Sequence, residues 1–223
     1  MSDYQSHGNS SPSTLETIRG ACDRLGSLKM RGELGRAIAN IVLAYSPRDL
    51  QQMHWNFSEK IQKIDPAYRK HLEETITGFL HGTYHNVRLM NQQGVFLLMR
   101  EPLPDSVTAY WKMVAEQCIT AGSEKDRLQF LKFLLEGFCM LVQEIPGHPV
   151  GMPFPGGDKV ELIDGVFYCP VRTKANDVDA ALCPFCPALQ TPEVGYLRPP
   201  VNASMHRKQE FIRNCYDFHN FNG

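Results

Sequence analysis

Four cysteines in the last quarter of the chain are its clearest candidates for chemistry. Their spacing is Cys169-x13-Cys183-Pro-Phe-Cys186-x28-Cys215. Four thiolates that include one close C-x2-C pair can surround a metal, because the pair supplies two ligands from one tight turn. Cys169, Cys183, Cys186 and Cys215 are therefore the predicted metal ligands.

Proline directly follows three of these cysteines, at Pro170, Pro184 and Pro187. Proline suits turns and is poorly tolerated inside helices and strands, which favours ligand-bearing turns over packing in a small apolar core. Zinc and a [4Fe-4S] cluster both accept four thiolates, so the spacing leaves the choice between them open. Three histidines are reserve ligands that would give a three-cysteine, one-histidine site: His148, His206 and His219.

The other three cysteines lie at core spacing within apolar stripes of predicted helices and are assigned to packing: Cys22, Cys118 and Cys139. His81 and His85 stand four residues apart and would share one helix face. No carboxylate completes an H-E-x-x-H motif there, and a hydrogen-bonded helix surface is the favoured interpretation.

Composition indicates a folded cytoplasmic protein. The chain has 223 residues, of which 43% are hydrophobic and 21% charged, and a formal net charge of −1 argues against a global polyanion binder. The sequence contains no run of 18 or more apolar residues, so membrane insertion is not expected. Residues 1–6 lack the pattern of a signal peptide. In a reducing cytoplasm the seven cysteines are not expected to form disulfides.

The elements that must position the cysteines follow a helical body. Residues 1–12 are predicted to be a disordered tail, and a capping box at Ser13 opens residues 13–145, where apolar periodicity predicts about six helices. Two further helix starts are indicated at Ser46-Pro47 and Asp65-Pro66. The later helices are expected over residues 67–90, 105–121 and 123–144.

A Pro/Gly-rich loop at residues 146–157 separates this body from a cysteine-rich metal-binding module at residues 158–223. Within the module, Asp164-Gly165 predicts a type I′ turn in a β-hairpin that ends at Cys169. Apolar spacing around Cys215 predicts a final helix. The expected fold class is α+β and mainly α.

Three motifs resemble a family of uncharacterised proteins from methanogenic archaea. They are HPVGMPFPGG at residues 148–157, YCPV at residues 168–171 and CPFCPA at residues 183–188. The resemblance extends from the helical body to the C-terminus and implies a strictly anaerobic cytoplasm, which favours an iron–sulfur cluster. It implies the same four cysteines as ligands and supplies no catalytic residue.

The sequence predicts a metal-binding cytoplasmic protein that acts as a protein-interaction or redox-responsive module. Met152 and Phe154 would either anchor a protein partner or pack back onto the module. One alternative is nucleic-acid binding through basic residues near the C-terminus: Arg198, His206, Arg207, Lys208 and Arg213. The other is a metalloenzyme, although no catalytic constellation is recognisable and the prediction leans against an enzyme.

Overall fold

The computed structural model describes residues 14–118, 123–154, 157–173 and 182–191. Its α-helices are α1 (Thr14–Ser27), α2 (Arg31–Val42), α3 (Pro47–Lys60), α4 (Pro66–Gln92), α5 (Ser106–Gln117) and α6 (Ser123–Gly137). Two short helical turns are η1 (Val95–Leu97) and η4 (Cys183–Phe185), and η2 (Phe138–Val142) is a π-helix. The strands are β1 (Glu161–Ile163), β2 (Val166–Cys169) and β3 (Leu189–Gln190). The α+β, mainly α fold class is confirmed.

Two helix starts confirm the capping signals in the sequence. The side chain of Asp49 accepts a hydrogen bond from the backbone N–H of Ser46, which closes a capping box at the start of α3. The side chain of Asp65 accepts from the N–H groups of Ala67 and Tyr68 at the start of α4. Proline occupies the first turn of both helices, where its missing N–H has no cost.

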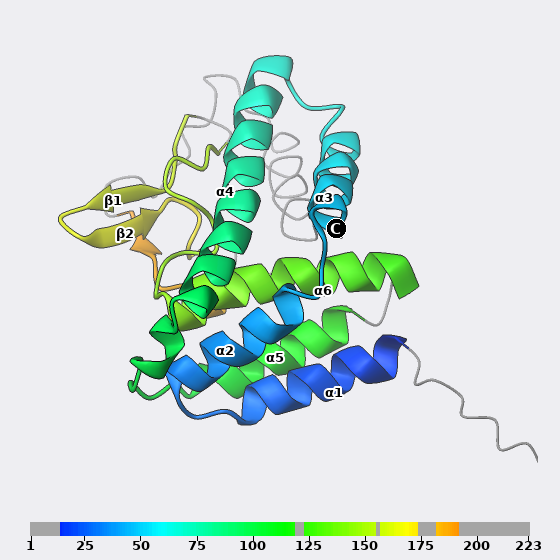
Figure 1. Ribbon diagram of the computed structural model, residues 1–223. Coiled ribbons are helices and arrows are strands. Elements are labelled where there is room, and N and C mark those ends of the chain that lie inside the picture. The colour runs from blue at the N-terminus through cyan, green and yellow to red at the C-terminus, as the bar shows by residue number, and fades with distance from the viewer. Residues whose placement is uncertain (1–13, 119–122, 155–156, 174–181, 192–223) are drawn as a thin grey trace, which may run out of the picture.

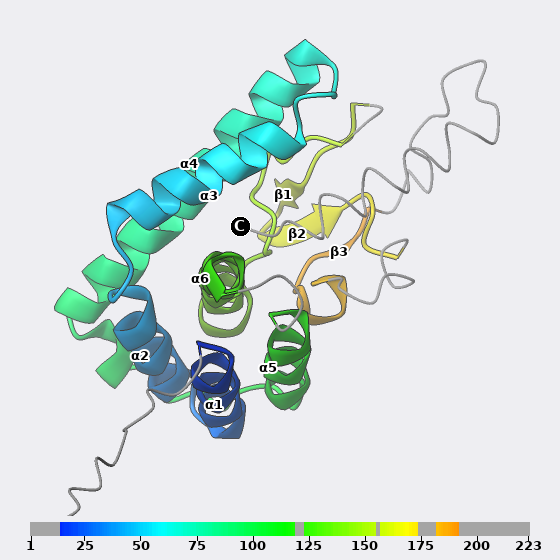
Figure 2. The same ribbon diagram turned by 90° about the vertical axis from the view of Figure 1, so that its right-hand side faces the viewer.

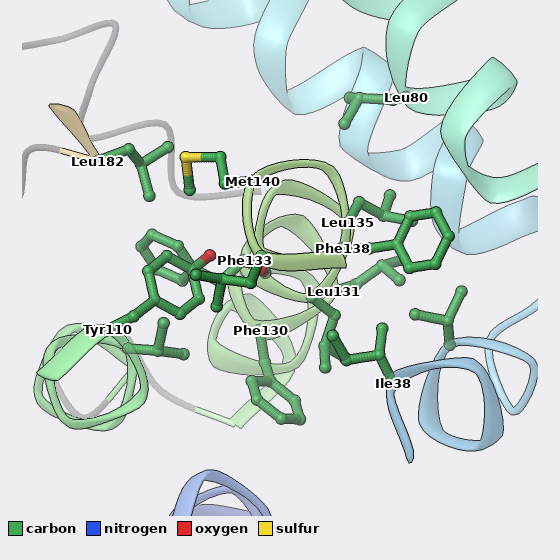
Figure 3. Close-up of a cluster of buried hydrophobic side chains, with 14 of the residues drawn as sticks. Ile38, Leu80, Tyr110, Phe130, Leu131, Phe133, Leu135, Phe138, Met140 and Leu182 are labelled. Atoms are coloured by element: carbon green, nitrogen blue, oxygen red, sulfur yellow. Dashed lines mark hydrogen bonds between the residues drawn. The ribbon is translucent and has the colours of Figure 1, made fainter. Parts of the chain in front are cut away.

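Helix α6 is the centre of the fold. Figure 2 shows it nearly end-on, between the α3–α4 pair on one side and α1, α2 and α5 on the other. Its side chains leave in every direction, with Leu131, Phe133 and Leu135 reaching different neighbours (Figure 3), and all three are buried. A helix that is apolar around most of its circumference must be covered on all sides.

The end of α6 is unusual because the chain widens into the π-helix η2 before it leaves the body. The N–H of Gln143 donates to the carbonyl of Phe138, and the N–H of Ile145 donates to that of Cys139. Glu144 then takes a left-handed conformation with φ 55°. A single π-turn inside a helix is rare and occurs often at functional sites. The sequence predicted a continuous helix over 123–144 and gave no sign of this change.

The small sheet has the strand order β1-β2-β3 and lies beside α4 and α6 (Figures 1 and 2). Strands β1 and β2 form the predicted hairpin, with φ values of 49° at Asp164 and 80° at Gly165. Positive φ at both central residues defines the predicted type I′ turn. Strand β3 pairs with β2 in parallel, with Tyr168 opposite Leu189.

One hydrophobic cluster contains residues from both the helices and the segment after residue 146. The later segment contributes Met152, Phe154, Val160, Val171 and Leu182, all buried. The predicted division into a tail, a helical body, a loop and a cysteine-rich module, with boundaries after residues 12, 145 and 157, concerns which parts are stable on their own. That division stays a prediction. Met152 and Phe154 are buried in this cluster, which favours packing onto the module over a role as exposed anchors for a partner.

The predicted N-terminal tail and the predicted helix around Cys215 lie outside the described residues. Among the helices that the structure describes, none is long and apolar enough to cross a membrane.

Candidate metal centre

Cys169 ends strand β2 and is buried. Immediately afterwards the chain turns, with the N–H of Arg172 donating to the carbonyl of Cys169. The backbone N–H groups of Val171 and Arg172 also donate to the Cys169 sulfur. Pro170 favours this turn because its ring fixes φ, and the next two N–H groups can then face the sulfur.

Cys183 and Cys186 occupy a second tight turn. Cys183 is the first residue of η4, and the N–H of Cys186 donates to the Cys183 carbonyl over 3.1 Å. The Cys186 sulfur accepts from the N–H groups of Ala188 and Gly147. Pro187 has no N–H to offer, and the amide one residue further on takes that role. Gly147 belongs to the loop that leaves the helical body, so this loop also contacts the turn.

Side-chain hydrogen bonds tie the two turns together. The Arg172 Nε donates to the Ala188 carbonyl over 3.1 Å, and the Gln190 Nε2 donates to the Pro170 carbonyl over 3.0 Å. The backbone N–H of Thr173 donates to Gln190 Oε1 over 2.9 Å. These bonds hold the Cys169 turn against the chain that follows Cys186, and they accompany the parallel β2–β3 pairing.

The three described module cysteines line one cavity, together with His148 and Met140. Its volume is about 10 Å³, close to that of a single water-sized sphere. Met140 belongs to the π-helix η2, so the change in helix type directs a residue of the body to this cavity. His148 is thus the one reserve ligand that the structure places there.

Burial dominates the electrostatics of these thiols. It raises the pKa of Cys169 to about 11 and that of Cys183 to about 12, and it also raises the pKa of Cys186. The N–H groups directed at Cys169 and Cys186, and the Arg172 charge, lower these pKa values and so oppose the effect of burial. N–H donors and a cation that favour thiolate inside an apolar site are what a metal–thiolate centre requires.

No three His, Cys, Asp or Glu side chains of residues 14–118, 123–154, 157–173 and 182–191 are grouped closely enough to hold a metal ion as they stand. Cys215, His206 and His219 lie outside those residues, as do the basic residues of the nucleic-acid alternative. The donor set fits a thiophilic metal in chemistry: three thiols, N–H groups directed at two of them, and a fourth predicted ligand beyond residue 191.

The cysteines assigned to packing are all buried in the core, as predicted: Cys22, Cys118 and Cys139. Cys139 lies in η2, with its sulfur 3.6 Å from the Thr83 hydroxyl. His81 and His85 are exposed on α4, in agreement with the surface interpretation.

Sequence reasoning missed two further features near the cavity. One is Arg172, whose position three residues after Cys169 was a usable signal. The other is a buried ion pair in α6 between Lys132 and Glu136, with 3.7 Å between Nζ and Oε1. Their spacing of four residues indicates a pair on one helix face. Nothing in the sequence indicated that this face is covered.

The fold and the site together define a mainly helical protein with a small sheet, next to which Cys169, Cys183 and Cys186 line one cavity. The chain belongs to the family described as "Uncharacterized protein conserved in archaea" (DUF2115), whose model matches residues 30–191. This confirms the resemblance to archaeal proteins stated from the motifs. No solved structure matches the chain.

Relatives from methanogens carry the name UPF0305 protein. One from Methanothermobacter thermautotrophicus is 57% identical over 47 residues, which are 21% of this chain and 30% of that protein. One from Methanopyrus kandleri is 31% identical over 85 residues, 38% of this chain and 60% of that protein. One from Methanocaldococcus jannaschii is 24% identical over 133 residues, 59% of this chain and 79% of that protein. The chain therefore spans less than two thirds of the length of the first two relatives.

Proposed function

We propose that this protein binds zinc or a [4Fe-4S] cluster in the cytoplasm through Cys169, Cys183, Cys186 and Cys215. The observation that carries the proposal is the gathering of the three described cysteines, from two separate turns, around one cavity. His148 lines that cavity and is the alternative fourth ligand. The metal would cross-link the two turns and supply a closed thiolate centre.

The thiol pKa values support a proton-coupled centre. Near neutral pH, thiols with pKa values of about 11 and 12 are protonated. A bound metal requires thiolates, so uptake releases protons, and the affinity falls as the pH falls. The hydrogen bonds from Val171, Ala188 and Gly147 would then strengthen, since their acceptors become charged.

Anaerobic purification followed by metal and sulfide analysis and an absorption spectrum tests the proposal directly. One zinc per chain without sulfide indicates a zinc site, whereas iron with equal sulfide and a broad visible band indicates a cluster. Cys183→Ala should lose the metal. Cys22→Ala is the matched control, because it also removes a buried thiol and should retain the metal.

Two results would refute metal binding. One is protein that stays metal-free after both zinc and iron–sulfide reconstitution under anaerobic conditions. The other is a Cys183→Ala variant that keeps the full metal content. Separate Cys215→Ala and His148→Ala variants then distinguish the two candidates for the fourth ligand.

The proposed role of this centre is to hold a protein-docking surface whose shape depends on the metal. One face of the sheet supports it, because Ile163, Val166 and Leu189 are 48%, 37% and 55% exposed. Paired residues of adjacent strands point to the same side, and the register Ile163↔Val166 and Tyr168↔Leu189 places all three on that face. Exposed apolar groups of this kind mark interaction sites.

An anaerobic pull-down with the metal-loaded protein tests this role, with Leu189→Asp and Cys183→Ala compared against Cys22→Ala. A specific partner should be lost from the first two variants and retained by the control. A partner that the metal-free Cys183→Ala variant retains at full yield would overturn the metal-dependent role.

A further inference from the structure

Helix α6 buries charged groups, which a structural helix rarely does. Lys132 and Glu136 are only 6% and 7% exposed in their side chains. Removing an ion pair from water costs more than its attraction returns unless the remaining hydrogen-bonding capacity is also satisfied. Buried ionisable groups with incomplete satisfaction are therefore candidates for a functional site.

Glu136 has one oxygen in use and one without a partner. Its Oε1 lies 3.7 Å from the Lys132 Nζ, while its Oε2 has no hydrogen-bond partner in the part of the chain that the structure describes. Burial raises the pKa of Glu136 to about 7, and the Lys132 charge opposes that rise. A buried carboxylate oxygen without a donor is costly, so a bound N–H or O–H group would stabilise the site.

Glu136 lines a second cavity of about 30 Å³. Its other walls include Phe57 and Phe79 from α3 and α4, together with Leu80, His148 and Met152. Apolar walls with a small number of polar groups are the usual anatomy of a small-molecule site. At about 10–15 Å³ for each water-sized occupant, the cavity holds two or three non-hydrogen atoms.

The charges around this cavity favour an uncharged ligand. Lys132 already offsets the Glu136 carboxylate, so a second cation would be repelled and an anion would face the carboxylate directly. The ligand must instead bring one hydrogen-bond donor for Oε2 and a carbon portion for the aromatic and aliphatic wall.

We propose that this cavity binds an uncharged molecule of about three non-hydrogen atoms that carries a hydroxyl or an amide N–H. The donor bonds to Glu136 Oε2, and the carbon portion packs against Phe57, Phe79 and Leu80. Gly147 and His148 line this cavity and the cysteine cavity alike. The ligand is thus placed next to the proposed metal centre, but its binding needs none of the four cysteines.

Methyl and amide NMR titrations of the full chain with ethanol and with formamide test this site at pH 8, where Glu136 is mainly ionised. Saturable shifts of Ile76 and Met152 are expected, with millimolar dissociation constants for so few atoms. Glu136→Gln should weaken ethanol binding at least tenfold. Glu74→Gln, an exposed glutamate on α4, is the matched control and should change nothing.

A second variant keeps the test decisive if Glu136→Gln does not fold. Ile76→Val removes one methyl group from the wall and should shift selectivity from ethanol toward propan-1-ol at least twofold. Shifts that rise linearly without saturation, or equal affinities in wild type and Glu136→Gln, would mean that the cavity holds water only. Saturable binding in Cys183→Ala would uphold this site whatever the outcome for the metal.

Discussion

The cysteines of the helical body are buried, as are Cys169 and Cys183 of the sheet region, whereas Cys186 is partly buried. The two groups differ more in what surrounds the sulfur. Cys22 and Cys139 lie on helices, and burial raises the pKa of each to about 12. Cys169 and Cys186 lie on turns, where backbone N–H groups are directed at the sulfur. Helical N–H groups are already bonded within the helix, so only turn cysteines acquire such donors.

The packing cysteines and the predicted ligands therefore differ in local backbone more than in burial. In this chain the residue after the cysteine is the sequence signal of that difference. Proline follows Cys169, Cys183 and Cys186, whereas Asp, Ile and Met follow the three packing cysteines Cys22, Cys118 and Cys139.

The largest expected effect is a difference in amide hydrogen exchange between the helical body and the sheet region. Metal removal should leave amides of α1–α6 protected and make those of residues 157–173 and 182–191 exchange at least a hundredfold faster, since the turns lose their cross-link. Native-state exchange of metal-bound and chelated protein measures this. A uniform loss of protection would mean one cooperative core, which the shared hydrophobic cluster makes a real alternative.

The second-largest effect is expected at Glu136, a buried charged residue of α6. Its pKa is about 7 when folded, against 4.5 for the ordinary carboxyl, so the folded state binds the proton more tightly. Unfolding free energy should therefore fall by about 3 kcal/mol as pH rises from 4.5 to 7. Denaturant titrations across this range measure the slope, relative to Glu136→Gln. Parallel curves for the two proteins would contradict the raised pKa.

A smaller effect is expected at Cys118, which is fully buried in the helical body. Cys118→Ser places a hydroxyl in an apolar site and should cost about 1–3 kcal/mol of stability. The metal content should not change. Denaturation combined with metal analysis checks both, and loss of metal from this variant would erase the distinction between the two groups of cysteines.

The smallest effect tests whether the helical body is stabilised locally. Asp65→Ala removes the cap that accepts from Ala67 and Tyr68 and should cost about 1 kcal/mol. Glu74→Ala on the exposed face of α4 is the control. A change in metal affinity for Asp65→Ala would show that the two regions are more tightly coupled than this comparison assumes.

Much of the fold could be predicted from local sequence. The caps at Ser46 and Asp65 and the Asp164-Gly165 turn specify their elements through contacts within a few residues. The parallel pairing of β2 with the two-residue strand β3 could not be predicted, because it depends on Arg172 and Gln190 reaching across a long connection. Tertiary contacts also decide the burial of Lys132 and Glu136.

The metal site itself stays a prediction. The cysteine set came from spacing, and the structure adds the cavity that Cys169, Cys183 and Cys186 share. The position of His148 at that cavity could not be predicted from the sequence, because it depends on the direction in which the chain leaves α6. Cys215 lies outside the described residues.

The π-helix at Phe138–Val142 determines the direction in which the chain leaves the helical body. A π-turn amounts to one residue inserted into an α-helix, and each residue rotates the chain by about 100°. Deleting one residue from this stretch would restore a regular helix and swing Met140 and the Gly147 amide away from Cys186. We therefore expect single-residue insertions or deletions here to be tolerated far less than substitutions.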